Sequence, residues 1–267
     1  MMPTAINSPD DPRVRVYREL PSRKSGRDNP HFVVEGRWLV QRLINSKLQT
    51  ASILCGELQA EEFAALGHAI PVYVASPELL SQIVGFDFHR GILACGRRPP
   101  SLSLASAAEN WHAPVAIAAC AGVCDQENLG SVIRNCRAFG AGGLIVDSDC
   151  ADAFSRRVLR VSAGAALDLT IVESGDLFRD LAELKNGHGF RLVATVTDQA
   201  AAEIEATPIH EKLVIAFGNE GFGLDQRVRD LCDDEVTIRL HAGFDSLNVG
   251  TASGIFLHHY TRRQNPL

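Results

Sequence analysis

The first hundred residues alternate short apolar runs with segments in which apolar residues recur at helical spacing. Runs rich in β-branched and apolar residues predict strands at 31–36, 51–55, 70–75 and 91–96. Helical spacing predicts helices at 38–44, 59–66 and 77–83. This alternation predicts a small α/β domain over residues 1–98.

The remainder of the chain predicts a second α/β domain. Adjacent prolines and small polar residues over 99–112 predict a linker. The apolar run 115–121 that follows is typical of a strand buried on both faces of a parallel sheet. Further strands are predicted at 143–146, 167–172, 190–196, 212–218 and 235–240, with helices at 128–140, 152–163, 175–186, 224–232 and 246–261. We therefore predict an open parallel sheet over 113–267.

Charge is distributed unevenly along the 267 residues, whose net charge is −6. Residues 1–100 hold 12 Lys and Arg against 10 Asp and Glu, whereas the remainder holds 14 against 22. The basic excess gathers within 13–42, where the candidate phosphate-binding residues are Arg23, Lys24, Arg27 and Arg37. A solvated helix face explains the same charges equally well.

Cysteine usage and hydropathy indicate a cytoplasmic protein. The seven cysteines lack CxxC spacing, so we expect reduced thiols and no metal site, with Cys120 and Cys124 buried in an apolar run. No stretch approaches the about 18 apolar residues of a membrane span. The N-terminus has no apolar signal core before its charges.

Ligands of open parallel sheets bind beyond the carboxyl ends of the strands, which directs attention to the loops after 115–121, 212–218 and 235–240. In the first loop, Asn128 is a plausible N-cap and Arg134 lies on the first turns of the following helix. A purely structural interpretation, with a capping Asn128 and a surface ion pair at Arg134, stays open.

The second loop, "FGNEGFGL", contains three glycines that allow a ligand to approach the backbone closely: Gly218, Gly221 and Gly223. The spacing is neither a dinucleotide fingerprint nor a P-loop, and Glu220 would repel a phosphate. A ligand with an adenine or ribose and a partly positive charge fits better. A tight structural turn is the alternative.

The third segment, "SLNVGTASG", offers Ser246 and Asn248 and then begins a helix with small residues at 250–254. These are poor helix formers, so we expect a segment or a cofactor packed closely against them. The adjacent His258 and His259 point about 100° apart and form no metal pair. No serine lies in a GxSxG elbow of a hydrolase.

Together and in this order, "DQENLGSVIRNCRAFGA", "LVIAFGNEGFGL" and "IRLHAGFDSLNVGTASGIFLHH" resemble the three motifs of the SpoU (TrmH-like) RNA 2′-O-methyltransferases of the SPOUT superfamily. "VSAGAALDLTIV" resembles a further stretch of that family, and "NPHFVVEGRWLVQRLI" and "FHRGILA" resemble its substrate-binding domain. The resemblance covers nearly the whole chain.

The resemblance implies an α/β fold with a C-terminal deep trefoil knot, a homodimer, and S-adenosylmethionine as the methyl donor without a metal. The donor-binding positions that it implies are Phe217, Gly218, Asn219, Gly223, Ile238, Leu240 and Leu247. The catalytic positions that it implies are Arg134, Asn128, Glu220, Ser246 and Asn248. Arg134 is expected to bind the phosphate beside the reacting ribose and lower the pKa of its hydroxyl, with the proton acceptor left open.

Three departures and three alternatives accompany this interpretation. Arg239 and "GTASG" replace the proline and the Val and Ala run of the third motif, and "DQEN" replaces "DPxN" in the first. The alternatives are an inactive, ribosome-associated RNA-binding protein, a tRNA 2′-O-methyltransferase and a small-molecule methyltransferase. The N-terminal domain favours ribosomal over transfer RNA as the substrate.

Overall fold

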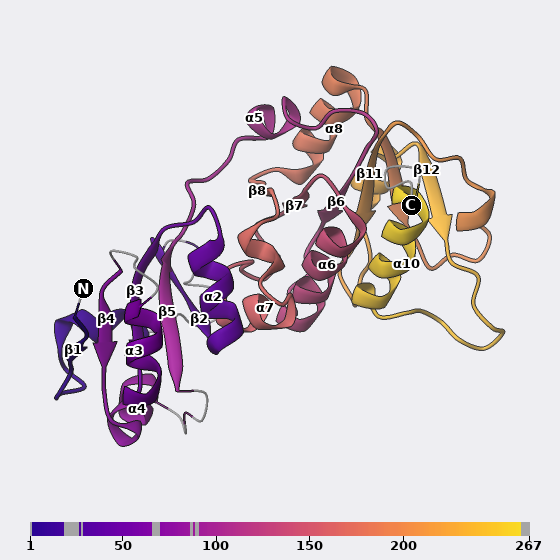
Figure 1. Ribbon diagram of the computed structural model, residues 1–267. Helices are drawn as coiled ribbons and strands as arrows, with labels where there is room; N and C mark the ends of the chain where they lie inside the picture. Colours follow the sequence, from indigo (N-terminus) through magenta and orange to yellow (C-terminus); the bar gives the residue numbers. More distant parts are fainter. Residues whose placement is uncertain are drawn as a thin grey trace. The chain divides into compact units, whose positions relative to one another are not determined.

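The computed structural model describes residues 2–18, 27, 29–65, 70–85, 88 and 91–262. Contacts between residues divide the chain into two units (Figure 1). The N-terminal unit comprises residues 1–99 and 152–167, and the C-terminal unit comprises 100–151 and 168–267. The predicted division into domains at 1–98 and 113–267 with a linker at 99–112 stays a prediction.

The N-terminal unit contains a mixed five-stranded sheet of order β1-β4-β3-β5-β2. Its strands are β1 (Thr4–Ala5), β2 (His31–Glu35), β3 (Thr50–Cys55), β4 (Val72–Val74) and β5 (Ile92–Arg97). Strands β1, β4 and β3 are parallel, whereas β5 runs antiparallel to both β3 and β2. The helices are η1 (Pro12–Val14), α1 (Arg15–Arg18), α2 (Arg37–Asn45), α3 (Glu57–Ala65) and α4 (Pro77–Val84).

Residues 152–167 belong to the N-terminal unit although they connect two strands of the C-terminal sheet. They contain α7 (Arg156–Val161), which packs against β2, and η2 (Ala165–Leu167). The Nη1 and Nη2 atoms of Arg98 donate to the two oxygens of the Asp152 carboxylate, at 2.9 and 2.8 Å. Because both side chains are nearly buried, this two-point ion pair fixes the segment within its unit.

The C-terminal unit contains seven parallel strands in the order β10-β12-β9-β11-β6-β7-β8. These are β6 (Val115–Cys120), β7 (Leu144–Val146), β8 (Ile171–Glu173), β9 (Arg191–Thr195), β10 (Ala202–Glu203), β11 (Lys212–Phe217) and β12 (Asp234–Thr237). The helices are α5 (Leu104–Ala108), α6 (Gln126–Phe139), α8 (Leu177–His188), η3 (Ile204–Ala206), α9 (Gln226–Leu231) and α10 (Val249–Thr261).

Side chains that alternate along the central strands pack on the two faces of this sheet. Val115, Ile117 and Ala119 of β6 join the core formed with α5, α8 and α9. The opposite face is covered by α6 and α10, which lie side by side (Figure 1). There the ring of Phe217 in β11 lies 6.0 Å from that of Phe256 in α10. Burial on both faces explains the unbroken apolar sequence of β6.

The predicted two-part α/β fold with a parallel second sheet is confirmed. The predicted helix at 152–163 is shorter than expected, and the predicted linker contains the short helix α5. The prediction that Cys124 is buried is wrong, because it lies exposed in the loop after β6, whereas Cys120 is buried within that strand. All seven cysteines are free thiols. Across the described ranges, no helix has the length and apolar character needed to cross a membrane.

Candidate active site

A cavity of about 670 Å³ lies at the carboxyl ends of β9, β11 and β12. It is bordered by the turn after β11, the segment before α10 and Asn128 of α6. Its lining includes all seven predicted donor-binding residues: Phe217, Gly218, Asn219, Gly223, Ile238, Leu240 and Leu247. Its size is that of a pocket for a small molecule.

The turn after β11 is closed by its own backbone and by the side chain of Asn219. A Cβ on Gly218 would lie 2.2 Å from the carbonyl carbon of Gly223, so the close approach of the two backbones requires glycine. Asn219 and Gly223 exchange two main-chain hydrogen bonds, of 3.0 and 2.9 Å. Asn219 Nδ2 donates to the Gly122 carbonyl at 2.7 Å, and its Oδ1 accepts from the Gly221 amide at 2.8 Å. Asn219 therefore shapes the turn as well as lining the pocket.

The expected N-cap role of Asn128 is wrong. The side chain of Asp125 caps α6 by accepting from the amides of Glu127 and Asn128, at 2.8 and 3.0 Å. Helix α6 begins at Gln126, so Asn128 lies within its first turn. Its side chain is thereby available to the pocket.

Three of the predicted catalytic side chains form one directed chain of hydrogen bonds. Asn248 Oδ1 caps α10 by accepting from the Gly250 amide at 2.8 Å. This fixes its Nδ2 as the donor to Asn128 Oδ1 at 2.7 Å, which in turn leaves Asn128 Nδ2 to donate to Glu220 Oε1, also at 2.7 Å. The chain ends on a carboxylate, which can accept a hydrogen bond from a substrate hydroxyl.

The charges around the pocket favour a cationic ligand. Asp198, Glu220 and Asp245 line it, and the single lining cation among the described residues, Arg229, forms an ion pair with Glu235 at 2.8 Å. A ligand with phosphates would be repelled, whereas a positively charged group would be attracted. The residues present thus fit S-adenosylmethionine, whose sulfonium is positive.

Small residues at the start of α10 allow it to pack closely on α6. A Cβ on Gly250 would lie 2.7 Å from the Cβ of Ser131. Asn135 of α6 donates to the Gly250 carbonyl at 2.8 Å and to the Ser253 hydroxyl at 2.9 Å. The close packing of two helices explains the small residues.

Arg239, the departure from the third motif, does not line the pocket, whereas its neighbours Ile238 and Leu240 do. Its side chain is 76% exposed and forms an ion pair with Glu203 of β10. The ion pair with β10 holds this side chain away from the donor site. This departure therefore leaves the predicted donor-binding residues in place.

The remaining predicted residues lie apart from the hydrogen-bonded chain. Ser246 lines the pocket and is exposed, whereas Arg134 is exposed on α6 and lines no part of it. In the N-terminal unit, Arg37 is exposed and pairs with Glu62 at 2.7 Å, and Arg27 is half-buried. Arg23 and Lys24 lie outside the described residues.

Comparisons with known proteins agree with this geometry. Residues 116–258 match the SpoU rRNA Methylase family. The chain belongs to this family. As the motifs predicted, it is an S-adenosylmethionine-dependent RNA 2′-O-methyltransferase.

Two relatives and one solved structure cover most of this SpoU methylase. A Mycobacterium bovis protein named as an uncharacterized tRNA/rRNA methyltransferase is 33% identical over 96% of this chain and 91% of its own. The 23S rRNA (guanosine-2′-O-)-methyltransferase RlmB of Acinetobacter baylyi is 30% identical over 73% and 79%. The AdoMet-bound rRNA methyltransferase of Sinorhizobium meliloti has a TM-score of 0.85 at 23% identity, with 99% of both chains covered, and shows the same fold.

One side of this SpoU methylase's pocket was not predicted from its sequence. Thr195, Thr197, Asp198 and Gln199, in and after β9, line the pocket. Thr195 Oγ1 donates to the carbonyl of Ala216 in β11 at 2.9 Å. The rule that directed attention to the other loops applies equally here, since β9 pairs with β11 and ends at the same edge.

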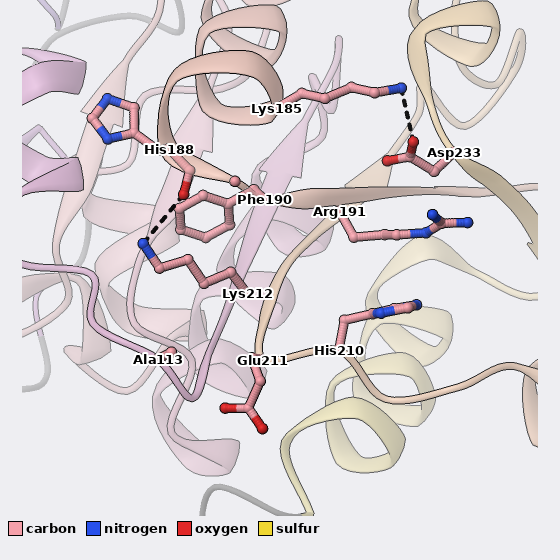
Figure 2. A pocket seen from close by; sticks show the side chains of 10 residues that line it. Ala113, Lys185, His188, Phe190, Arg191, His210, Glu211, Lys212 and Asp233 are labelled. Carbon is pink, nitrogen blue, oxygen red and sulfur yellow. Dashed lines mark hydrogen bonds and ion pairs between the residues drawn. The ribbon is translucent and has the colours of Figure 1, made fainter.

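A second cavity, of about 720 Å³, lies at the opposite, amino ends of the strands (Figure 2). Its cations are engaged within the protein. Lys185 pairs with Asp233 at 2.8 Å, Arg191 pairs with Asp234 at 2.9 Å, and Lys212 donates to the His188 carbonyl at 3.2 Å. Ligands of open parallel sheets bind at the carboxyl ends of the strands, so position favours the first pocket as the site.

In the part of the chain that the structure describes, the pocket has no metal site, and no cysteine belongs to its lining. The described residues contain no group of three or more His, Cys, Asp or Glu side chains that could hold a metal ion. Burial raises the pKa of the Cys136 thiol, in α6, to about 12. This thiol is therefore protonated at neutral pH and unreactive.

Proposed function

We propose that this SpoU methylase methylates a ribose 2′-hydroxyl of ribosomal RNA, with the donor bound in the pocket at the carboxyl ends of β9, β11 and β12. The Asn248–Asn128–Glu220 chain at this pocket carries the proposal, because it presents a carboxylate acceptor among the donor-binding residues. The rRNA assignment is supported by RlmB of Acinetobacter baylyi, a 23S rRNA (guanosine-2′-O-)-methyltransferase.

The pocket suits both the adenosine and the positively charged sulfonium of the donor. When bound, S-adenosylmethionine supplies an electrophilic methyl group on a positively charged sulfonium. A Cβ on Gly223 would meet nothing within 4 Å, so the backbone there is open to an adenosine, and the carboxylates of Asp198, Glu220 and Asp245 attract the cation. Phe217, which is buried between the sheet and α10, closes the floor with its apolar ring.

The hydrogen-bonded chain positions the ribose. Glu220 accepts from the 2′-hydroxyl, and the direction of the chain holds its carboxylate in place through Asn128 and Asn248. Ser246 offers a hydroxyl at the exposed rim. Holding the attacking oxygen in line with the methyl group supplies the main rate gain of such a reaction.

Arg134 acts across a homodimer interface in this proposal. It lies six residues after Asn128, about 120° away around the helix, and therefore points away from its own pocket. Arg134 is exposed on α6, and Thr251 and the 38% exposed, apolar Ile255 are exposed on α10, which packs against α6. A second copy docked there would bury Ile255 and bring Arg134 to the phosphate next to the partner's target ribose.

The proposal also includes the trefoil knot and a cytoplasmic location. The 2.7 Å approach of a Gly250 Cβ to Ser131 supports a tightly threaded C-terminal segment. The proposed ribosomal RNA substrate supports a cytoplasmic location of the protein. Neither the knot nor the location is needed for the chemistry at the pocket.

Calorimetry and methyl transfer test the proposed function. We expect S-adenosylmethionine to bind in a 1:1 ratio to each chain, and ATP not to bind, because of the carboxylates in the pocket. With a donor labelled in its methyl group, 23S rRNA should be labelled and tRNA should not. Labelling of tRNA alone would contradict the rRNA assignment, and absence of donor binding would contradict the pocket.

A further inference from the structure

The N-terminal unit carries an exposed tryptophan that no part of the methyl-transfer chemistry uses. Trp38, in the first turn of α2, is 54% exposed, whereas Leu39, Val40 and Leu43 of the same helix are buried. Tryptophan combines a large apolar ring with a polar N–H and is enriched at binding interfaces. Trp38 is therefore a candidate for contact with a ligand.

Arg42 covers one face of the Trp38 ring and leaves the other face to a ligand. It lies one turn further along α2, and its guanidinium carbon is 5.4 Å from the centre of the Trp38 ring. Its Nη1 donates to the Ala163 carbonyl at 3.0 Å. The stacking and the hydrogen bond together hold the guanidinium in place.

The turn that holds Arg42 has an unusual backbone. Ala163 has φ of 51°, and within the described ranges it is the single non-glycine residue with positive φ. A Cβ on the next residue, Gly164, would lie 2.9 Å from Leu39 and 3.0 Å from the Cδ of Arg42, so the turn packs tightly on α2. Strained residues of this kind gather at ligand-binding sites.

The surroundings of Trp38 favour a polyanion. Residues 36–56 contain Arg37, Arg42 and Lys47 and no acidic residue, and Arg37 has Glu62 of α3 as its acidic partner. Gln41 and the exposed Asn45 follow Trp38 by three and seven residues, which places their amides on the same face of α2. Amides at this spacing can bind the edges of a base, whose plane stacks on an aromatic ring or a guanidinium.

We propose that Trp38 and Arg42 form a stacking site for an unpaired nucleotide of the substrate RNA. This proposal rests on RNA being the substrate of the enzyme and assigns it a second point of contact. Positive charge attracts the phosphates, and the base stacks on the face of the Trp38 ring opposite the Arg42 guanidinium. No sequence-specific contact is required. The site therefore selects single-stranded segments of RNA over continuous duplex.

Tryptophan fluorescence reports on this site directly. The chain contains two tryptophans, and the other, Trp111, is 3% exposed in the core of the C-terminal unit. Titrating the full-length protein with a single-stranded adenylate octamer should quench the exposed fraction of the emission. An RNA duplex of equal length should quench it much less. In a Trp38→Phe variant, the quenching should be lost while most of the affinity remains.

Single substitutions distinguish the contribution of stacking to RNA affinity from the contribution of positive charge. Trp38→Ala should weaken octamer binding by about 5- to 150-fold, the range for loss of one base–aromatic stack. Because tryptophan is uncharged, the slope of log K against log salt should stay the same, whereas Arg37→Ala should reduce it by about one unit. Leu58→Ala removes another exposed apolar side chain of this unit, 94% exposed, and should leave the affinity unchanged.

Unchanged octamer affinity in Trp38→Ala, or saturating RNA without quenching in the wild type, would overturn the stacking site. So would a change of oligomeric state in Trp38→Ala, which would assign the side chain to a contact between copies. Donor binding and labelling of rRNA by the wild type are measured alongside. Their failure would contradict the proposed function, whereas normal labelling with an unchanged KM for RNA in Trp38→Ala would contradict only the stacking site.

Discussion

Asn128 Nδ2 donates a 2.7 Å hydrogen bond to Glu220 Oε1, and this bond joins the first turn of α6 to the turn after β11. The two residues are 92 positions apart in the sequence, in the first and second motifs. Asn248, from the third motif, determines the direction of this bond by donating to Asn128. Three separate motifs thus meet in one hydrogen-bonded chain.

Asn248→Asp should separate the capping of α10 from the positioning of Glu220. Aspartate still caps the helix, so the melting temperature should change little. Its carboxylate cannot donate to Asn128, so the turnover number should fall on the order of 100-fold through loss of alignment. Steady-state kinetics and thermal unfolding measure the two effects. A normal turnover number would show that the direction of the chain is unimportant.

Arg134→Ala should nearly abolish turnover and retain most of the donor binding, because Arg134 lies outside its own pocket. Mixing this variant with Asn128→Ala tests the interface. If each site takes its arginine from the partner, random mixing restores about a quarter of wild-type activity, since half of the dimers are mixed and each holds one intact site. An arginine acting within its own chain predicts no recovery.

Gly250→Ala should destabilise the protein although alanine is the better helix former. The added Cβ would meet Ser131 at 2.7 Å and force α10 away from α6, at a cost of about 1–3 kcal/mol in the free energy of unfolding. Gly187→Ala in α8 is the matched control, because its Cβ would meet nothing within 4 Å. It should stabilise the protein by about 0.5–1 kcal/mol. Urea unfolding of both variants measures the contrast.

His259 should make stability depend on pH. Burial lowers its pKa, and the charges of Arg262 and His258 lower it further, whereas Glu205 raises it. The folded state therefore holds fewer protons than the unfolded state between the lowered pKa and about 6.5, so stability rises with pH across this window. Above about pH 6.5, His259 makes its full contribution to the free energy of unfolding.

The measurement is the free energy of unfolding of the wild type, His259→Gln and His241→Gln between pH 5 and 8. His259→Gln should reduce the loss of stability below about pH 6.5, because glutamine does not titrate. His241 is exposed in the loop before α10, so His241→Gln should keep the wild-type slope. Equal slopes in all three proteins would contradict the role of His259.

The sequence pattern predicted most elements of the fold because burial imposes a local periodicity. The strand at β6, for example, follows from an unbroken apolar run. The assignment of 152–167 to the N-terminal unit could not be predicted, because its helix looks like an ordinary crossover between β7 and β8. That assignment depends on distant contacts such as the Arg98–Asp152 ion pair.

The sequence predicted which residues form the candidate site better than it predicted what each of them does. The motifs identify Asn128, but its N-cap role was mistaken because Asp125, three residues earlier, caps the helix and Asn128 lies inside it. The contribution of β9 was missed, since its polar residues have no unusual spacing. Side-chain direction and partners depend on tertiary structure, which local patterns do not contain.

Nucleoside analysis after methyl transfer tests the central claim most directly. Purified protein is incubated with labelled S-adenosylmethionine and 23S rRNA from cells that lack the enzyme, and the RNA is digested to nucleosides and separated by mass spectrometry. We predict one 2′-O-methylated nucleoside with the wild type and almost none with Arg134→Ala. A methyl group on a base, or equal ribose methylation by the two proteins, would contradict the account.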